Sequence, residues 1–360
     1  MADLILKKKD NHRRKIIRQS LYYKKTIIGG IIMKKKLLSL LLMTVMVVTG
    51  LTGCGVAKKE TATTAEKTYK VAMICDSSIS DGGWGAACYN AMVTAGKANG
   101  FETQYTDSIT SANFASSMRA YCDLGFDLIF APGNQYTDAV KQVAADYPKV
   151  NFALLNGTVQ TANIASILPD AKQIGYMAGA LAGLMTKTNK IGFIGGMELD
   201  TTKAKLACYE AAAKIANPSV VGFSAYAGSF SDTAKGKEIA NSMITNNNVD
   251  VFFGDASAVD SGAREVLATY KDKYDIAQPS DLLATQKSDA VIGSVVTDNA
   301  TMVGLCMKDV KEGTYGNKTV YGNLANGALS VGTFGTAISA DVKAKYLDIV
   351  EKIKAGTFIK

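Results

Sequence analysis

The segment Asp127–Gly157, "DLIFAPGNQYTDAVKQVAADYPKVNFALLNG", decides the fold class of this chain. It opens with one short apolar run and closes with another. Between them, residues 136–146 carry apolar side chains at helical spacing. Two buried strands joined by one helix predict a βαβ unit, in which the strands are parallel and the crossover is right-handed.

The same alternation of short apolar runs and amphipathic stretches extends in both directions from this segment. Upstream, the run "KVAMI" is expected to be a strand, and helices are expected at Trp84–Asn99 and Ala112–Leu124. Downstream, the pattern restarts with four more expected helices, at Ala171–Met185, Thr201–Ala216, Ser231–Thr245 and Val259–Tyr274. The sequence therefore predicts an α/β protein with two Rossmann-like lobes in series, each built on a parallel sheet.

The net charge of +8 belongs to the N-terminal part of the chain. Residues 1–53 hold 12 of the 40 Lys and Arg residues and 2 of the 32 Asp and Glu residues, so the remainder carries a net charge of −2. A body with that charge has no basic footprint, and we expect no nucleic-acid partner. The only histidine, His12, also lies in this part, which argues against Ser-His or Cys-His catalysis and against histidine metal ligands in the body.

From Met33 the sequence reads "MKKKLLSLLLMTVMVVTGLTGCG", which has the basic, apolar and small-residue order of a secretion signal. Its apolar run, Leu37–Val48, is shorter than the roughly 20 residues that span a bilayer. The ending Leu51–Cys54 resembles the lipobox of bacterial lipoproteins, which implies that Cys54 is acylated and becomes the mature N-terminus. An uncleaved anchor helix is the alternative interpretation.

The N-terminal part divides into three predicted segments. Residues 1–32 carry a second basic block that does not fit a signal peptide, so we interpret them as a non-native extension. Residues 33–53 are then the lipoprotein signal peptide. Residues 54–67 are polar and rich in Thr, Lys and Glu, which predicts a flexible tether, and the folded body is expected to begin near Thr68.

Polar and aromatic residues gather where the predicted strands end. Open α/β sheets bind their ligands outside the carboxyl ends of the strands, so we expect these residues to face a cleft. The predicted ligand-binding residues are Asp76, Asp81, Trp84, Asn134, Asn156, Phe230, Asp255 and Asp298.

Trp84, the only tryptophan, stands among glycines in "DGGWGAAC", where a strand gives way to a helix. We expect its ring to contact a ligand in the cleft. The alternative is that it staples the first helix onto the sheet. Phe230 precedes a predicted helix in "AYAGSFSD" and is expected to face the cleft from the second lobe. Asp81 is also a candidate helix cap, since an acid before a helix satisfies free amides.

Nucleotide-cofactor motifs do not occur in the sequence. Neither "DGGWGAAC" nor "GFIGGMELD" fits GxGxxG, and there is no GxxxxGK[ST] segment. We therefore expect no cofactor, no bound metal, no catalytic residue and no enzymatic activity. The remaining enzymatic interpretation is an enzyme of nucleoside metabolism, and release of free base from a nucleoside would support it.

Three blocks, "DLIFAPGNQYTDAVKQVAADYPKVNFALLNG", "NIASILPDAKQIGYMAGALAGLMTKTNKIGFIGGM" and "YAGSFSDTAKGKEIA", resemble the basic membrane protein family of bacterial lipoproteins, which are substrate-binding proteins of ABC importers. The resemblance covers essentially Lys70–Gly335. It implies a periplasmic-binding-protein type I fold, in which two lobes joined by hinge crossovers enclose a purine between aromatic rings. The lobe boundaries are expected at 68–168 plus 297–324 for lobe 1 and 169–296 plus 325–360 for lobe 2.

On this resemblance, Trp84 and Phe230 match the two stacking aromatics of the family. Asn156 stands where an Asp usually reads the edge of the base, and its amide still offers a donor and an acceptor. Gly85 stands where an Asn usually follows the first aromatic.

Two further departures concern the ribose. Pro279 replaces an Asp that contacts a ribose hydroxyl in the family, and Thr297 replaces a Lys. Asp281 or Asp298 are candidates for part of the ribose contact. A free nucleobase therefore stays open as the ligand beside a nucleoside.

The resemblance implies a monomeric lipoprotein, held through Cys54 on the extracytoplasmic face of the cell membrane. It is expected to deliver a purine-type small molecule to ABC permease and ATPase subunits by closing its cleft. Two alternatives stay open: a ligand-sensing receptor that signals to a membrane kinase, and a binder of a different flat heterocycle.

Overall fold

In the computed structural model, the segment Asp127–Gly157 folds as a βαβ unit. The strand β3 (Leu128–Ala131), the 3-10 turn η2 (Asn134–Tyr136), the helix α4 (Thr137–Asp146) and the strand β4 (Asn151–Leu155) follow one another. β3 pairs in parallel with β4, with Leu128 opposite Asn151. Because all four β3 residues are buried, this strand is apolar throughout rather than alternating, as expected for a sheet covered on both faces.

The structure describes residues 67–80 and 84–359. They fall in the unit Glu66–Lys360, one of the two units into which the chain divides. The predictions for the extension, the signal peptide, Cys54 and Asp81 lie outside the described residues. Within the described part, no helix combines the length and the apolar character that crossing a membrane requires.

The first sheet has six strands, in the order β11-β5-β4-β3-β1-β2, and all its neighbouring strands are parallel. The remaining strands of this sheet are β1 (Tyr69–Ile74), β2 (Phe101–Thr106), β5 (Ile164–Pro169) and β11 (Thr319–Gly322). Besides α4, its helices are α2 (Trp84–Asn99), α3 (Phe114–Asp123), preceded by the 3-10 turn η1 (Ser111–Asn113), and α10 (Asn299–Glu312).

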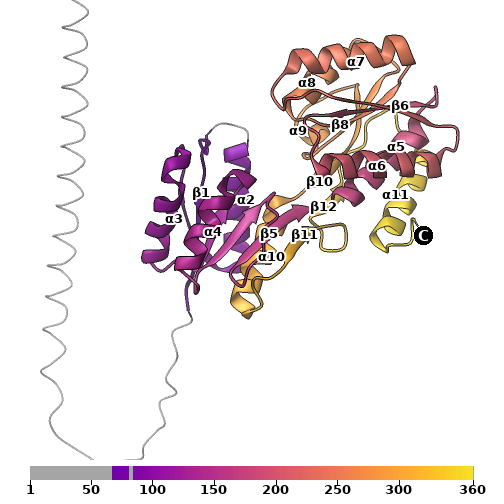
Figure 1. The fold of residues 1–360 in the computed structure, drawn as a ribbon. Helices are drawn as coiled ribbons and strands as arrows, with labels where there is room; N and C mark the ends of the chain where they lie inside the picture. The colour runs from indigo at the N-terminus through magenta and orange to yellow at the C-terminus, as the bar shows by residue number, and fades with distance from the viewer. Residues whose placement is uncertain (1–66, 81–83, 360) are drawn as a thin grey trace, which may run out of the picture. The chain divides into compact units, whose positions relative to one another are not determined.

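The second sheet also has six strands, in the order β12-β10-β9-β8-β6-β7. The strands are β6 (Lys190–Gly195), β7 (Val221–Tyr226), β8 (Val251–Asp255), β9 (Tyr274–Ala277), β10 (Val291–Thr297) and β12 (Leu329–Val331). The helices of this half are α5 (Ala171–Met185), α6 (Asp200–Ala216), α7 (Thr233–Asn247), α8 (Ala258–Leu267), α9 (Leu282–Thr285) and α11 (Ala340–Lys354) (Figure 1). The predicted parallel sheet therefore carries one antiparallel strand, because β12 runs antiparallel to β10 at its edge.

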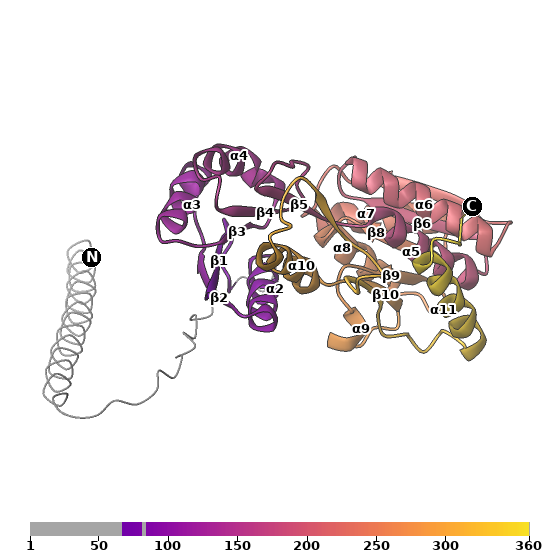
Figure 2. The same cartoon turned by 90° about the horizontal axis from the view of Figure 1, so that it is seen from below.

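The chain passes between the two sheets three times. The passages lie between β5 and α5, between β10 and α10, and between β11 and β12. The late strand β11 therefore completes the first sheet, where Thr319 lies opposite Ser166 on β5. The late helix α10 packs against α2 (Figure 2), and the Lys311 ammonium donates to the Asn99 carbonyl at 3.1 Å.

Two predicted helix boundaries need correction. The predicted helix Val259–Tyr274 is too long, because the chain turns after Leu267: the Thr269 and Tyr270 amides bond back to carbonyls three residues earlier, both at 3.0 Å. Tyr274 then starts β9 by donating its amide to the Asp250 carbonyl at 2.9 Å. The helix predicted from Ser231 begins at Thr233, because its cap is Asp232, whose carboxylate accepts from the Lys235 amide at 2.9 Å.

Glycines at helical spacing let α5 and α6 pack backbone to backbone. A methyl group at Gly179 would overlap the Tyr209 carbonyl oxygen. Gly175 and Gly183 face Lys205 and Ala213 of α6 in the same way. The pair of helices thus belongs to the buried core of the second sheet, together with Phe193.

Gly179→Ala should therefore destabilise the protein by about 1 to 3 kcal/mol, because the added methyl must push two helices apart in a packed core. Chemical denaturation measures this directly. Gly304→Ala in α10 is the matched control, because its new methyl would meet no backbone: it would lie 3.2 Å from the Asn99 amide, the end of a side chain, and at an ordinary contact distance of 3.8 Å from the Ala95 Cβ. Equal stability of Gly179→Ala and the native protein would contradict the proposed backbone contact.

Candidate functional site

Two half-exposed aromatic rings line the same cavities. Trp84 begins α2 and is 38% exposed, and Phe230 lies between β7 and α7 and is 42% exposed. Both rings line a first cavity of about 540 Å³ and a second cavity of about 480 Å³. These volumes lie in the range of small-molecule sites. The carboxyl ends of both sheets thus contribute one large aromatic each to a shared hollow.

Each ring is held in place from behind. The Trp84 indole donates its Nε1–H to the Pro132 carbonyl at 2.7 Å, which ties the ring to the turn after β3. Phe230 packs directly on Gly196, where any Cβ would overlap its ring. The glycine directly after β6 therefore makes room for the phenyl ring. The exposed fraction of Trp84 disfavours the alternative that this ring is only a staple inside the helix–sheet interface.

Five residues line both the first and the second cavity: Trp84, Asn156, Lys205, Phe230 and Asp255. Asn156 follows β4 with a left-handed φ of 59°, a conformation that asparagine adopts more readily than most residues. This backbone turn brings an exposed amide side chain to the cavity wall. Asn134, the first residue of η2, lines the second cavity only.

A third cavity, of about 660 Å³, adjoins Trp84 from another side. Asp298 lines it as the cap of α10, and its carboxylate accepts from the Ala300 amide at 2.8 Å. Pro279 and Thr297 line both the first and the third cavity. The two departures from the family pattern that concern the ribose therefore lie on cavity walls.

Asp76 differs from the other predicted residues that the structure describes, because it lines none of these three cavities. Its carboxylate accepts from the Tyr136 hydroxyl at 2.9 Å and from the Gln135 amide at 3.2 Å, and its own amide donates to the Tyr136 hydroxyl at 2.7 Å. Burial raises the pKa of this phenol. Asp76 thus fastens the end of β1 to η2 rather than facing the hollow.

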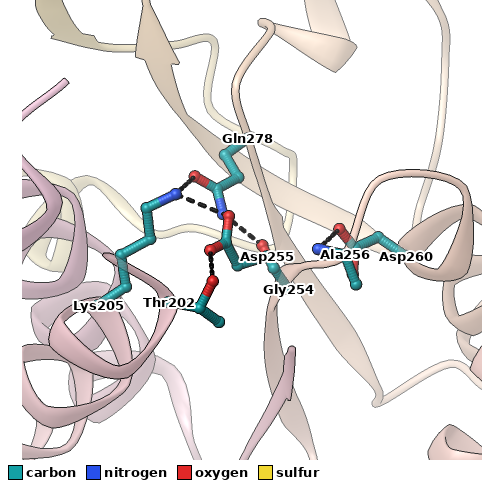
Figure 3. Close-up of polar contacts among 7 residues, drawn as sticks. All are labelled: Thr202, Lys205, Gly254, Asp255, Ala256, Asp260 and Gln278. Atoms are coloured by element: carbon teal, nitrogen blue, oxygen red, sulfur yellow. Dashed lines mark hydrogen bonds and ion pairs between the residues drawn. The ribbon is translucent and has the colours of Figure 1, made fainter. Parts of the chain in front are cut away.

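A polar cluster on the wall of the second sheet combines Asp255 with three residues that the sequence analysis missed: Thr202, Lys205 and Gln278 (Figure 3). Asp255 accepts from the Thr202 hydroxyl at 2.7 Å, from the Lys205 ammonium at 2.7 Å and from the Gln278 amide at 3.1 Å. Gln278 also donates to the Gly254 carbonyl at 2.5 Å. Thr202 and Lys205 stand three residues apart on α6, which puts both on the helix face that meets the end of β8. This spacing of three residues was the feature of the sequence that could have predicted both residues as part of the site.

Asp260, on α8, is a buried carboxyl group in the first cavity wall. Its Oδ2 accepts from the Ala256 amide at 2.9 Å, while no donor among the described residues reaches Oδ1. Burial raises the pKa of Asp260 to about 7; the negative charges of Asp275 and Asp255 act in the same direction, whereas the Ala256 amide and Arg264 oppose it. The sequence analysis did not single out Asp260, because nothing local marks an aspartate on a helix as buried.

A family model matches nearly the whole folded part of the chain. The family model Bmp, described as ABC transporter substrate-binding protein PnrA-like, matches residues 68–359. The chain therefore belongs to this family of ABC transporter substrate-binding proteins. It is a small-molecule binder that serves a permease and an ATPase on the extracytoplasmic side of a membrane, and it is not an enzyme.

A relative supports the same family, and solved structures share the fold. The chain is 30% identical over 285 residues to the ABC transporter nucleoside-binding protein BmpA of Lactococcus lactis, covering 73% of this chain and 81% of that protein. A transcriptional activator of the comK gene from Bacillus halodurans superposes with a TM-score of 0.71 at 21% identity, covering 81% of this chain and 100% of the other. An ABC transporter solute-binding protein from Conexibacter woesei superposes with a TM-score of 0.64 at 21% identity, covering 81% and 98%.

The structural likenesses establish the fold alone, which is the predicted periplasmic-binding-protein type I fold with two lobes. Their titles describe different activities on one architecture, as is usual for widely used folds. The ligand has to be argued from the residues of the site.

Proposed function

We propose that this protein binds a purine nucleoside or nucleobase between Trp84 and Phe230 and delivers it to an ABC importer. The observation that carries the proposal is that these two rings are both exposed and line the same two cavities. A planar heterocycle fits between such rings because stacking on an aromatic stabilises a bound base by roughly 1 to 3 kcal/mol. The nucleoside-binding relative in Lactococcus lactis supports the same ligand class.

Delivery follows from closure of the two lobes on the ligand. Trp84 belongs to the half built on the first sheet and Phe230 to the half built on the second. A ligand that contacts both rings favours the closed arrangement, because only that arrangement makes both sets of contacts. The closed form is then the one that a permease recognises.

The proposal includes attachment to the membrane through acylated Cys54 and a monomeric body at the end of the tether. The lipobox-like sequence Leu51–Cys54 supports this attachment. Metabolic labelling with a radioactive fatty acid should mark the native protein and leave Cys54→Ala unlabelled. Equal labelling of both would contradict acylation at this position.

Binding is tested by titrating nucleosides, nucleobases, sugars and amino acids into the full chain. Trp84 is the only tryptophan, so its fluorescence reports on the site without engineering. We expect purines to change the emission and sugars and amino acids to leave it unchanged. Flat titrations across all purines, together with no heat of binding by calorimetry, would overturn the proposal.

The same titration decides between a nucleoside and a free base. Pro279 and Thr297 line the first and third cavities and offer no charged group to a ribose hydroxyl, which favours the free base. Asp298 in the third cavity favours the nucleoside, because a carboxylate accepts from a hydroxyl. Tighter binding of inosine than of hypoxanthine would select the nucleoside.

A further inference from the structure

We propose that Lys205 determines which heterocycle is bound, by donating a hydrogen bond to a carbonyl oxygen on the ring. The site would then select oxopurines over aminopurines and would reject phosphorylated ligands. This inference rests on the proposed function and names the substrate class within it.

The geometry of Lys205 suits such a contact. Its side chain is 12% exposed, yet it lines both the first and the second cavity, together with both aromatic rings. An ammonium has three donors. Among the described residues, one donor is taken by Asp255 at 2.7 Å and another by the Gln278 carbonyl oxygen at the longer distance of 3.4 Å (Figure 3). One donor is left for a ligand, on a group that is held in position by its partners.

The charge around Lys205 favours a neutral acceptor over an anion. Asp255 forms an ion pair with the ammonium, so the pair has no net charge to offer. Lys205 is the only basic residue among the described residues that line the three cavities, whereas Asp255 and Asp298 contribute carboxylates there. A phosphate in these cavities would meet carboxylates without a free cation, whereas a ring carbonyl accepts a charge-assisted hydrogen bond at no such cost.

An amino group in place of the carbonyl is disfavoured for the opposite reason. It would point a second donor at the ammonium, so the remaining donor of Lys205 would find no acceptor on that group. A site that hydrogen-bonds one ligand group rejects an analogue that cannot make the bond, because its own buried polar group is left unsatisfied. Hydrogen bonds to charged groups are strong enough to give a preference of about 10- to 100-fold.

The experiment compares Kd values for hypoxanthine, adenine, inosine, adenosine and inosine monophosphate by calorimetry. The native protein should bind each 6-oxo compound about 10- to 100-fold more tightly than its 6-amino partner, and inosine monophosphate more weakly than inosine. Lys205→Met should lose most of this discrimination. Lys203→Met is the matched control, because Lys203 lies on the same helix in an exposed ion pair with Glu198 and lines none of the three cavities.

Loss of Lys205 leaves Asp255 without its charged partner, so a second variant guards against misfolding. The double variant Lys205→Met/Asp255→Asn removes both charges and keeps an acceptor for Thr202. It should also bind 6-oxo and 6-amino compounds about equally. A native protein that binds both classes equally, or a folded variant that keeps the full preference, would overturn the role of Lys205 and leave purine binding intact. A native protein that binds no purine would overturn the proposed function itself.

Discussion

Ionisation of Asp260 should cost the native protein about 4 kcal/mol of stability as the pH rises from about 4 to 7, and Asp260→Asn should not show this loss. The unfolded carboxyl group has its ordinary pKa of 3.8, whereas burial raises the pKa in the folded protein to about 7. Between these values the folded state binds more protons than the unfolded state. The stabilising contribution of this group is therefore complete below pH 3.8 and lost as the pH rises through about 7.

The measurement is the free energy of unfolding from denaturant titrations at several pH values, taken as the difference between variant and native protein. Burial also raises the pKa of Asp275, but both proteins contain Asp275. Taking the difference therefore isolates the effect of Asp260. An asparagine keeps an acceptor for the Ala256 amide. Asp200→Asn removes an exposed carboxylate at the start of α6 and should show no such trend. A difference for Asp260→Asn that stays constant from pH 4 to pH 8 would contradict the burial of an ionisable carboxyl group.

Trp84→Ala and Phe230→Ala should each weaken purine binding by about 5- to 150-fold, and the double variant should weaken it by roughly the product of the two effects. Each substitution removes one stacking face, worth roughly 1 to 3 kcal/mol per base. Calorimetric Kd values for one purine across the four proteins measure the effect. If the rings stack on opposite faces of the same heterocycle, each single substitution must cause a large loss of affinity.

Tyr270→Ala serves as the control for loss of an exposed aromatic, because Tyr270 is 38% exposed and lines none of the three cavities. It should bind purines with native affinity. The melting temperature of ligand-free Trp84→Ala should stay close to native, because the ring is partly exposed to solvent and, among the described residues, its one hydrogen bond goes to the Pro132 carbonyl. A large fall in that temperature with unchanged affinity would restore the interpretation of Trp84 as a staple.

Most of the fold could be predicted because its elements are written in local patterns. The strand "DLIFA" is apolar throughout and the following helix has apolar side chains at helical spacing, so the βαβ unit at Asp127–Gly157 was evident. The antiparallel strand β12 was not predicted, because a strand of three residues, Leu329–Val331, carries no alternation to read. The end of α8 was predicted too late in the chain, because helical spacing of apolar residues alone does not reveal the turn at Thr269.

The candidate site was predictable only where position along a strand implies position in space. Trp84, Asn156 and Phe230 follow strands and Asp255 ends one, and all four residues line shared cavities. Asp76 follows a strand too, but Tyr136 and Gln135 engage its carboxylate away from the cavities. Whether a strand-end residue faces the ligand or its neighbours depends on contacts that the strand pattern does not encode.

The sequence by itself determined the class of fold, the two aromatic positions and the absence of a histidine from the body, since composition and local periodicity are properties of the chain alone. Only the tertiary structure decided which residues form the polar cluster around Asp255. Lys205 meets Asp255 and Gln278 across 50 and 73 positions of the chain, because β8 and β9 lie side by side in the second sheet and Lys205 reaches from α6 to the residues at their ends. Burial likewise decided the chemistry of Asp260, because a carboxyl group keeps its proton to about pH 7 only where the surrounding protein excludes water.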